Sequence, residues 1–407
     1  MIMKHFSFLL GAGFSKPAGY PLTEEINSKF KNLTHKDFMI HTSQSANLIQ
    51  RGQEQNWLIE KYQYMFVEEF IKFYNEKIIP NSKFHYEDFF DYYNDLNRRE
   101  ELSSDEKRFF DEFKNKYDYP LDHHSLLFDF DRTYNQLVAH FITVEWPISA
   151  SILKPYSKRE HAEFLYFLEY LEEKSYKVHI HTLNHDLLME KYFHTLTLGN
   201  KISDGFDDSY SPYFANITIS VNKNDNLNPY TYDIRLRRFK NKFDSPFNLY
   251  KLHGSVDNYV FNLNNNKYDM IKWVYRISEG SVYKEITTHL GEIKKENFYV
   301  DVIPEFLSGT TEKLRHYERT VYYSQIFKRF FQNLNNSKHL IVIGYGFKDS
   351  KINEYLKTYF LNDSQKTMLV IDITKPQSEI LSQSNVKFVA KNVIDLDIEE
   401  IKSILNV

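Results

Sequence analysis

Four short motifs place glycine, amide and imidazole groups directly after apolar runs of the chain. The motifs are Gly11-Ala12-Gly13-Phe14-Ser15, Thr182-Leu183-Asn184-His185-Asp186, His253-Gly254-Ser255 and Gly344-Tyr345-Gly346. Glycine lets a backbone approach a phosphate or a sugar closely. An amide side chain can both donate and accept a hydrogen bond, and an imidazole can take up a proton near neutral pH. These residue types suit a site that holds a phosphorylated ribose and moves a proton.

The first motif has two interpretations. The small residues Gly11, Ala12 and Gly13 would let the backbone meet a pyrophosphate at the start of a helix that offers free N–H groups. Phe14 lies within the same turn, and Ser15 can add a hydroxyl donor. The alternative is a plain strand-to-helix turn. An ordinary dinucleotide dehydrogenase is disfavoured, because Lys16 replaces the third glycine of G-x-G-x-x-G and no acidic residue follows at the usual ribose-binding distance.

The second motif offers an amide and a carboxylate. Asn184 could bind a ribose or a water, and Thr182 precedes it at the end of the apolar run. Asp186 could fix the loop by accepting backbone N–H bonds, or it could cap the helix that follows. Both interpretations of Asp186 stay open on the sequence alone.

The third and fourth motifs also allow a structural and a functional interpretation. His253 at a strand end, next to a glycine, suits general-base catalysis, although a lone histidine is more often structural. Gly344 and Gly346 would allow a close approach to a sugar or base, or they could form a tight turn around a core Tyr345. Asp372 ends a further apolar run.

Strands that alternate with helices predict an α/β fold with a Rossmann-like parallel sheet. The predicted strands lie at 6–10, 177–182, 249–252, 340–343 and 368–373. In such sheets ligands bind beyond the carboxyl ends of the strands, where all four motifs lie. The motifs are therefore expected to meet at one rim.

The chain is expected to divide into a discontinuous domain and an insertion. Residues 1–50 and 175–407 form the predicted nucleotide-binding domain, with a small β excursion at 200–247. Residues 51–174 form a predicted large helical insertion, because apolar residues recur there at three- and four-residue spacing without strand alternation. The aromatic side chains of these helices could form a core or an interface.

Composition excludes several classes of protein. The net charge of −4 gives no global field for attracting nucleic acid, so we expect no direct nucleic-acid binding. The 407 residues include no cysteine, which excludes disulfides, thiolate zinc sites and a cysteine nucleophile and favours a cytoplasmic location. No apolar run reaches the roughly 18 residues that a membrane span requires, and residues 1–10 lack a signal-peptide cleavage site. No metal site is expected.

The motifs, in this order, resemble those of the sirtuin family, and most closely those of the bacterial SIR2-like group found in anti-phage defence. The matching segments are roughly 1–35 and 175–380. The resemblance implies a sirtuin-type fold with NAD as its substrate. Gly11, Ala12, Gly13 and Ser15 would then hold the pyrophosphate, with Phe14 and Thr182 among the cofactor-binding residues. Asn184 would orient the nicotinamide ribose and a water, Asp186 would support that loop or the nicotinamide pocket, and His253 would act as the base or hold a ribose hydroxyl. Gly344, Tyr345, Gly346 and Asp372 would lie on the adenosine side.

One departure from the family pattern directs the functional prediction. Deacetylating sirtuins carry a four-cysteine zinc ribbon, which a chain without cysteine cannot form. The resemblance to the defence group instead implies hydrolysis of NAD to nicotinamide and ADP-ribose in abortive infection. It further implies a homo-oligomer, control by a trigger or partner, and a HerA-like hexameric ATPase as one such partner. The alternatives are an NAD or ADP-ribose sensor without catalysis, and an assembly subunit for a partner ATPase.

Overall fold

The computed structural model describes residues 4–40, 46–48, 61–119, 122–142, 158–195, 201–219, 230–263, 267–273, 282–297 and 321–407. At its centre lies a seven-stranded sheet in the order β17-β16-β15-β1-β4-β10-β5, with every neighbouring pair parallel. Its strands are β1 (Lys4–Leu10), β4 (Tyr176–Thr182), β5 (Ile202–Ser203), β10 (Phe247–Lys251), β15 (His339–Ile343), β16 (Thr367–Asp372) and β17 (Val386–Ala390). The predicted α/β class with a Rossmann-like parallel sheet is confirmed.

Helices cover both faces of this sheet, which explains why its strands are continuous apolar runs. Phe6, Phe8 and Leu10 of β1 point into one core cluster, and Leu9 points into the cluster on the other face. The first cluster is covered by α7 (Ala162–Glu173), α8 (Leu188–Thr195) and α12 (Ile398–Leu405), and the second by α10 (Val321–Asn336) and α11 (Ser350–Leu356). This two-sided burial fixes the sheet rigidly and aligns the carboxyl ends of its strands.

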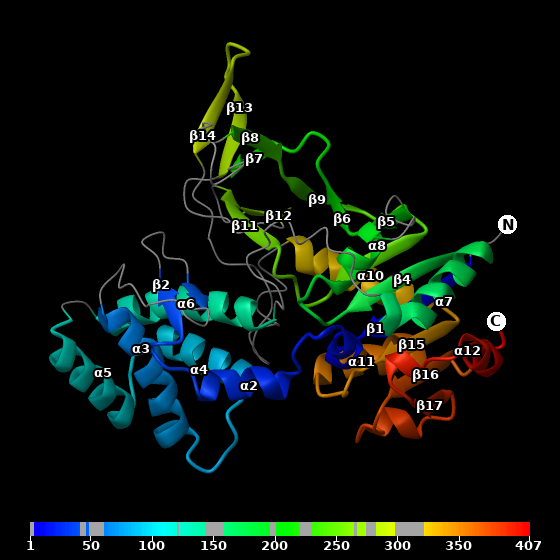
Figure 1. The fold of residues 1–407 in the computed structure, drawn as a ribbon, viewed down its shortest axis with the longest axis horizontal. Helices are drawn as coiled ribbons and strands as arrows, with labels where there is room; N and C mark the ends of the chain where they lie inside the picture. The colour runs from blue at the N-terminus through cyan, green and yellow to red at the C-terminus, as the bar shows by residue number, and fades with distance from the viewer. Residues whose placement is uncertain are drawn as a thin grey trace, which may run out of the picture.

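A separate group of helices surrounds a third, aromatic core. Figure 1 shows these helices gathered to one side of the sheet. They are α2 (Thr23–Lys31), α3 (Lys61–Phe73), α4 (Tyr86–Arg98), α5 (Ser104–Tyr117) and α6 (His123–Ile142). Phe70, Phe89 and Phe130 are fully buried and meet partly edge to face, so these rings are core residues. Predicted helical residues 57–60 and 143–144 lie outside the described part of the chain.

The borders of the helical insertion are not simple. α2 contributes Ile26 and Phe30 to the aromatic core, whereas α7 contributes Phe164 and Leu168 to the sheet core. A short hairpin of β2 (Phe38–Ile40) and β3 (Ala46–Leu48) also lies between α2 and α3. The division of the chain at residues 50 and 174 stays a prediction.

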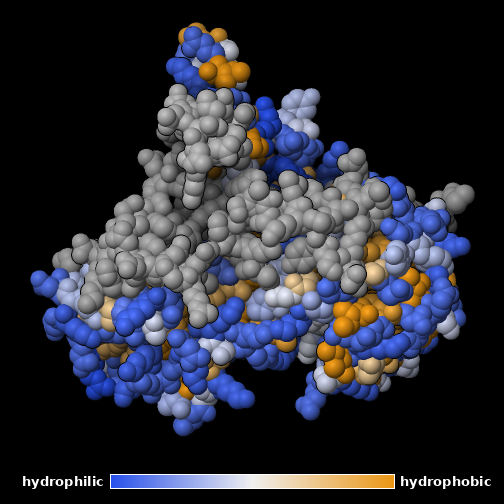
Figure 2. Space-filling model, viewed as in Figure 1, coloured by the Kyte–Doolittle hydropathy of each residue, from blue (hydrophilic) through white to orange (hydrophobic). Residues whose placement is uncertain are grey.

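Two small sheets follow α8. The predicted excursion at 200–247 contains β6 (Gly205–Asp207), β7 (Tyr213–Ile219), β8 (Tyr230–Arg235) and β9 (Arg237–Lys242). Further strands that we did not predict are β11 (Asn258–Leu263), β12 (Lys267–Lys272), β13 (Val282–Thr287) and β14 (Ile293–Asn297). The two sheets have the orders β11-β12-β9-β6 and β14-β13-β7-β8, and the β13–β14 hairpin projects from the molecule (Figure 1). Figure 2 shows hydrophilic side chains over much of the visible face, with apolar ones gathered near the C-terminal elements.

Candidate functional site

The loops after β1 and β15 pack against each other through glycines. Gly13 N donates to Gly344 O at 3.0 Å, and a Cβ added to Gly344 would lie 2.3 Å from Phe14 N. Gly344 also has φ +63°, a conformation that residues with a Cβ rarely adopt. A Cβ on Gly11 would lie 2.5 Å from Gly344 O. These glycines are therefore required for contact between two protein loops.

The first motif itself forms a single helical turn, α1 (Ala12–Ser15), and the longer helix α2 (Thr23–Lys31) follows it. The amide of Gly13 is bonded to Gly344, and Phe14 N donates to Gly11 O at 3.0 Å. These two amides are therefore engaged within the protein, and phosphate binding by the first motif stays a prediction. The protein uses them to hold the loop.

Asn184 joins the second motif to the first. Its Nδ2 donates to Gly11 O at 2.8 Å and to Ser15 Oγ at 2.9 Å, and its backbone N donates to Thr182 Oγ1 at 3.0 Å. Both N–H groups of the carboxamide are thus used, which fixes its orientation. Within the described part of the chain, no group donates to the Asn184 Oδ1. That oxygen is an oriented acceptor at the carboxyl ends of β1 and β4.

Asp186 is buried and helps to hold the same loop. Its Oδ1 accepts from the backbone N of Leu188, the first residue of α8, at 2.9 Å. Burial raises the pKa of Asp186, although the nearby Lys251 and the Ser15 hydroxyl oppose that shift. The Ser15 hydroxyl accepts from Asn184, so it serves the protein loop.

His253 lies in the loop after β10, beside the loop that carries Asn184. His185 O accepts from Val256 N at 3.1 Å, and the rings of His185 and His253 have centroids 6.2 Å apart. His253 is 5% exposed, and its Nε2 lies 3.3 Å from Asp349 Oδ2. The imidazole thus reaches from the end of β10 to the loop after β15.

The fourth motif contributes a core residue and an open glycine. Tyr345 is buried, and its hydroxyl donates to Asp349 O at 3.2 Å, as the core interpretation predicts. Among the described residues, no atom would lie within 4 Å of a Cβ on Gly346, so this glycine borders open space. Asp372 ends β16 and accepts from Thr374 N at 3.4 Å within its own turn. Among the described residues, no hydrogen bond joins Asp372 to the other motifs.

Phe14 points away from the rim. Its ring packs against His161 and Phe164, with centroids 4.6 Å and 4.9 Å away. His161 is fully buried, its Nε2 lies 2.7 Å from Phe14 O, and its Nδ1 lies 2.6 Å from Tyr192 Oη. Burial lowers the pKa of His161, so it supports the glycine turn as a neutral imidazole. No sequence signal pointed to His161, because a single histidine within the predicted helical insertion at 51–174 has no distinguishing pattern.

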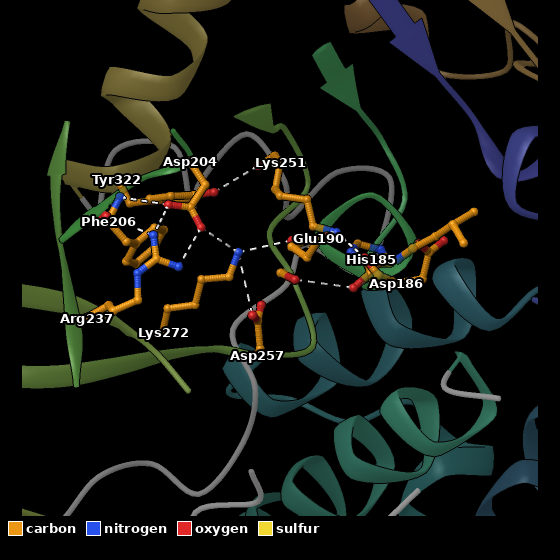
Figure 3. Close-up of polar contacts among 12 residues, drawn as sticks. His185, Asp186, Glu190, Asp204, Phe206, Arg237, Lys251, Asp257, Lys272 and Tyr322 are labelled. Atoms are coloured by element: carbon orange, nitrogen blue, oxygen red, sulfur yellow. Dashed lines mark hydrogen bonds and ion pairs between the residues drawn. The ribbon is translucent and has the colours of Figure 1, made fainter. Parts of the chain in front are cut away.

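A cluster of buried charges lies beside Asp186 (Figure 3). Its members are Glu190 of α8, Asp204 before β6, Arg237 of β9, Lys251 of β10, Asp257 of the loop after β10, and Lys272 of β12. Lys272 Nζ lies 3.0 Å from Glu190 Oε1, 3.1 Å from Asp204 Oδ2 and 3.5 Å from Asp257 Oδ2. Lys251 Nζ donates to Asp186 O and lies 3.5 Å from Glu190 Oε1. The cluster thus connects the loops after β4 and β10 to the central sheet and to the small sheet β11-β12-β9-β6.

These charges stabilise one another. Burial alone would lower the pKa of Lys272, but Asp257, Glu190 and Asp204 raise it well above its ordinary value. Burial likewise opposes ionisation of Asp204, yet Lys272 and Arg237 lower its pKa to about 2. The pKa of Asp257 is raised, because burial outweighs the attraction of Lys272. Lys272 is therefore the central cation of the cluster.

The described residues hold neither a metal-binding cluster nor a membrane-spanning helix. Among them, no group of three or more His, Asp or Glu side chains is arranged to hold a metal ion. None of the described helices is both long and apolar enough to cross a membrane.

Comparison with known proteins places the chain in a family. No curated protein matches it. Structural comparison aligns it with "Crystal structure of a Sir2 homolog–NAD complex" at 9% identity and TM-score 0.40, covering 99% of this chain and 91% of that chain. It also aligns with "The Structural basis of Sirtuin Substrate Affinity" at 11% identity and TM-score 0.37, covering 98% and 93%. A SIR2-like domain matches residues 178–389, which is more than half of the 407 residues and includes Asn184, His253 and Gly344. The chain therefore belongs to the SIR2-like family.

Proposed function

We propose that the chain binds NAD at the carboxyl ends of β15, β1, β4 and β10 and hydrolyses it to nicotinamide and ADP-ribose. The observation that carries the proposal is the fixed carboxamide of Asn184, whose Nδ2 is held by Gly11 O and Ser15 Oγ. This places an oriented acceptor beside the loop of His253. Membership of the SIR2-like family supports NAD as the ligand. The absence of cysteine from the sequence argues against a zinc-ribbon deacetylase.

The residues at this rim fit a dinucleotide in part. Gly346 borders open space and could meet the adenosine-side ribose through its backbone. Ser15 is buried and accepts from Asn184, so we assign it to positioning the carboxamide rather than to the phosphates. Asp186 supports the loop, because it accepts from Leu188 N at the start of α8.

The chemistry requires little covalent help from the protein. The bond between the ribose C1′ and the nicotinamide nitrogen breaks, and its electron pair neutralises the pyridinium ring. A water oxygen then bonds to C1′ and gives up a proton. Asn184 Oδ1 would orient that water or a ribose hydroxyl, and His253 would accept the proton. Positioning of this kind is where the protein contributes to the rate.

The test is release of nicotinamide from NAD by the purified chain and by Asn184→Ala and His253→Ala variants. Each variant should lose roughly two to four orders of magnitude in rate, as expected for positioning and acid–base groups. Matched controls are Asn97→Ala and His124→Ala, since these exposed residues contact each other within the helical group, at 3.2 Å between Nδ1 and Oδ1. Near-wild-type turnover by both folded site variants would end the proposal.

A second candidate is a sensor that binds NAD or ADP-ribose without cleaving it. It is favoured by the structural use of the two candidate catalytic side chains: Asn184 donates to Gly11 O, and His253 contacts Asp349. Calorimetry would support this candidate if NAD binds the wild-type chain without release of nicotinamide. The sensor candidate would be rejected if the wild-type chain releases nicotinamide and the Asn184→Ala variant does not.

We further propose that the enzyme is a cytoplasmic effector of anti-phage defence and that a partner or its own oligomerisation controls it. The reason is that uncontrolled hydrolysis of NAD would kill the cell that makes it. The purified chain alone should therefore release nicotinamide slowly or after a lag. Measuring its mass with and without a HerA-like ATPase would test for the assembly. Full activity of the isolated chain without a lag would contradict this regulation.

A further inference from the structure

A buried imidazole holds the far end of the glycine turn. His161 lies at the start of α7 and is fully buried. Its Nε2 lies 2.7 Å from Phe14 O of α1, and its Nδ1 lies 2.6 Å from Tyr192 Oη of α8. Because α8 follows the loop that carries Asn184, this one side chain connects the glycine turn to the element that continues from the second motif.

The partners of His161 fix which ring nitrogen carries the proton. A backbone carbonyl oxygen can only accept, so Nε2 donates to Phe14 O. Burial lowers the pKa of His161, and this effect outweighs the opposing effects of the Phe14 carbonyl and Glu160, so the ring is neutral. The Nδ1 of the neutral ring then accepts from the Tyr192 hydroxyl. The donor and the acceptor of the imidazole are thus both used within the protein.

The two ends of the glycine turn are held by different parts of the protein. At its start, Gly11 N donates to Ile343 O at 2.9 Å, so the central sheet fixes Gly11 and the Asn184 carboxamide that Gly11 O holds. At its end, the Phe14 carbonyl accepts from His161, and the two rings pack with centroids 4.6 Å apart. A helix of a single turn has little stability of its own. The end of α1 therefore depends on the imidazole.

We propose that His161 and Tyr192 are positioning residues for the glycine turn, an inference that rests on the proposed binding of NAD at this rim. The Tyr192 hydroxyl orients the imidazole, and the imidazole holds the Phe14 carbonyl, so the turn keeps the conformation that receives the dinucleotide. Both side chains are fully buried behind the turn and do not touch NAD. Their loss weakens binding and leaves the chemical step intact, because Asn184 is held separately through Gly11.

The first test measures hydrogen exchange and needs no ligand. Peptides that cover residues 11–15 report on the amides of Gly13 and Phe14, both of which are hydrogen-bonded. In His161→Asn the shorter side chain no longer reaches Phe14 O, so exchange at 11–15 should become faster on the order of tenfold. His161→Gln keeps an N–H donor where Nε2 lies and should exchange like the wild type. Exchange in β16 should be the same in all three proteins.

The second test separates binding from chemistry. His161→Asn should raise KM for NAD and Kd for ADP-ribose on the order of tenfold, with kcat changed by no more than about twofold. ADP-ribose is the probe for calorimetry because it contains the pyrophosphate and has no nicotinamide to release. Tyr192→Phe removes only the hydroxyl, so it should raise both constants by a smaller factor, and it replaces His161→Asn if that variant does not fold. The controls His289→Asn and Tyr166→Phe change exposed residues and should keep the wild-type constants.

The outcomes separate this inference from the proposed function. If the wild type binds neither NAD nor ADP-ribose and releases no nicotinamide, the proposed function fails, and hydrogen exchange alone decides whether the pair holds the turn. The inference is overturned if His161→Asn and His161→Gln exchange equally at residues 11–15, or if exchange in β16 rises to the same extent. A fall in kcat with an unchanged KM would also overturn it.

Discussion

Lys272→Met should destabilise the protein strongly, because it removes the central cation of a buried cluster. Lys272 is 5% exposed, and its Nζ lies within 3.5 Å of carboxylate oxygens of Glu190, Asp204 and Asp257. Methionine has a similar volume, so the change removes charge with little loss of packing. Leaving buried ions without a partner costs about 3–5 kcal/mol. We therefore expect a loss of that size in the free energy of unfolding, measured by urea denaturation near neutral pH.

The loss should depend on pH in a specific direction. In the wild type, burial raises the pKa values of Asp204 and Glu190, but the neighbouring cations outweigh that effect. The pKa of Asp204 is therefore lowered to about 2, and that of Glu190 is also lowered. Their contribution is therefore present above an ordinary carboxyl pKa of about 4 and is lost as pH falls toward 2. In Lys272→Met burial has less opposition, so the carboxyl pKa values rise and less of this contribution remains at neutral pH. The difference between the two proteins should be largest at about pH 7 and smallest as pH falls toward 2.

An exposed ion pair supplies the control for this prediction. Lys295 Nζ lies 2.7 Å from Asp233 Oδ2, but both side chains are largely in solvent. Water screens such pairs, so Lys295→Met should change the urea midpoint very little. The reasoning about the cluster is refuted if Lys272→Met is no more destabilised than Lys295→Met, or if its loss of stability is the same at both pH values.

Two further predictions concern the loops of the rim. Gly344→Ala should lower the free energy of unfolding by about 2–5 kcal/mol, because the cost of a left-handed φ and that of overpacking against Phe14 N add together. Gly346→Ala should be nearly neutral in urea denaturation, because no atom of the described residues lies within 4 Å of the added Cβ. Equal losses in the two variants would contradict the close packing of the two glycine loops. Asp186→Asn should lessen the fall in stability as pH rises above about 4, because burial raises the pKa of Asp186 and makes its ionisation in the folded protein unfavourable. Urea unfolding curves at a series of pH values above about 4 check this, and an unchanged slope would contradict it.

The central fold could be predicted because its strands are buried on both faces. Runs such as 340–343 are continuously apolar and end at glycine, so both their type and their end are clear in the sequence. The strands at 258–297 were missed because they lack this signal. β13 (Val282–Thr287) is buried only at its start, and β14 (Ile293–Asn297) is exposed over its described side chains, so neither shows a strong apolar pattern.

The candidate site could be predicted only where it depends on strand ends. Asn184 and His253 follow strands, and their convergence follows from parallel topology. The partners of these residues follow from contacts that the sequence does not encode locally. Asp349 had one local signal, an aspartate directly before a helix, but that signal indicates a cap and not a contact 96 positions earlier in the chain, at residue 253. Lys272 follows Met270 and Ile271 in β12 as a single charged residue, and because a lysine ordinarily reaches solvent, its type gives no sign of burial.

The buried charge cluster lies where it can fix the two loops of this rim. Replacing buried ions with apolar residues is often neutral or stabilising, so stability alone does not account for it. Lys272 contacts Glu190, which follows the Asn184 loop, and Asp257, which follows the His253 loop. One cation thus fixes two loops that lie beyond the ends of their strands, where strand pairing does not hold them. Hydrogen-bonded charges impose distance and direction, whereas apolar contacts impose only proximity. The cluster therefore sets the relative position of an amide and an imidazole, which is the quantity on which the proposed chemistry depends.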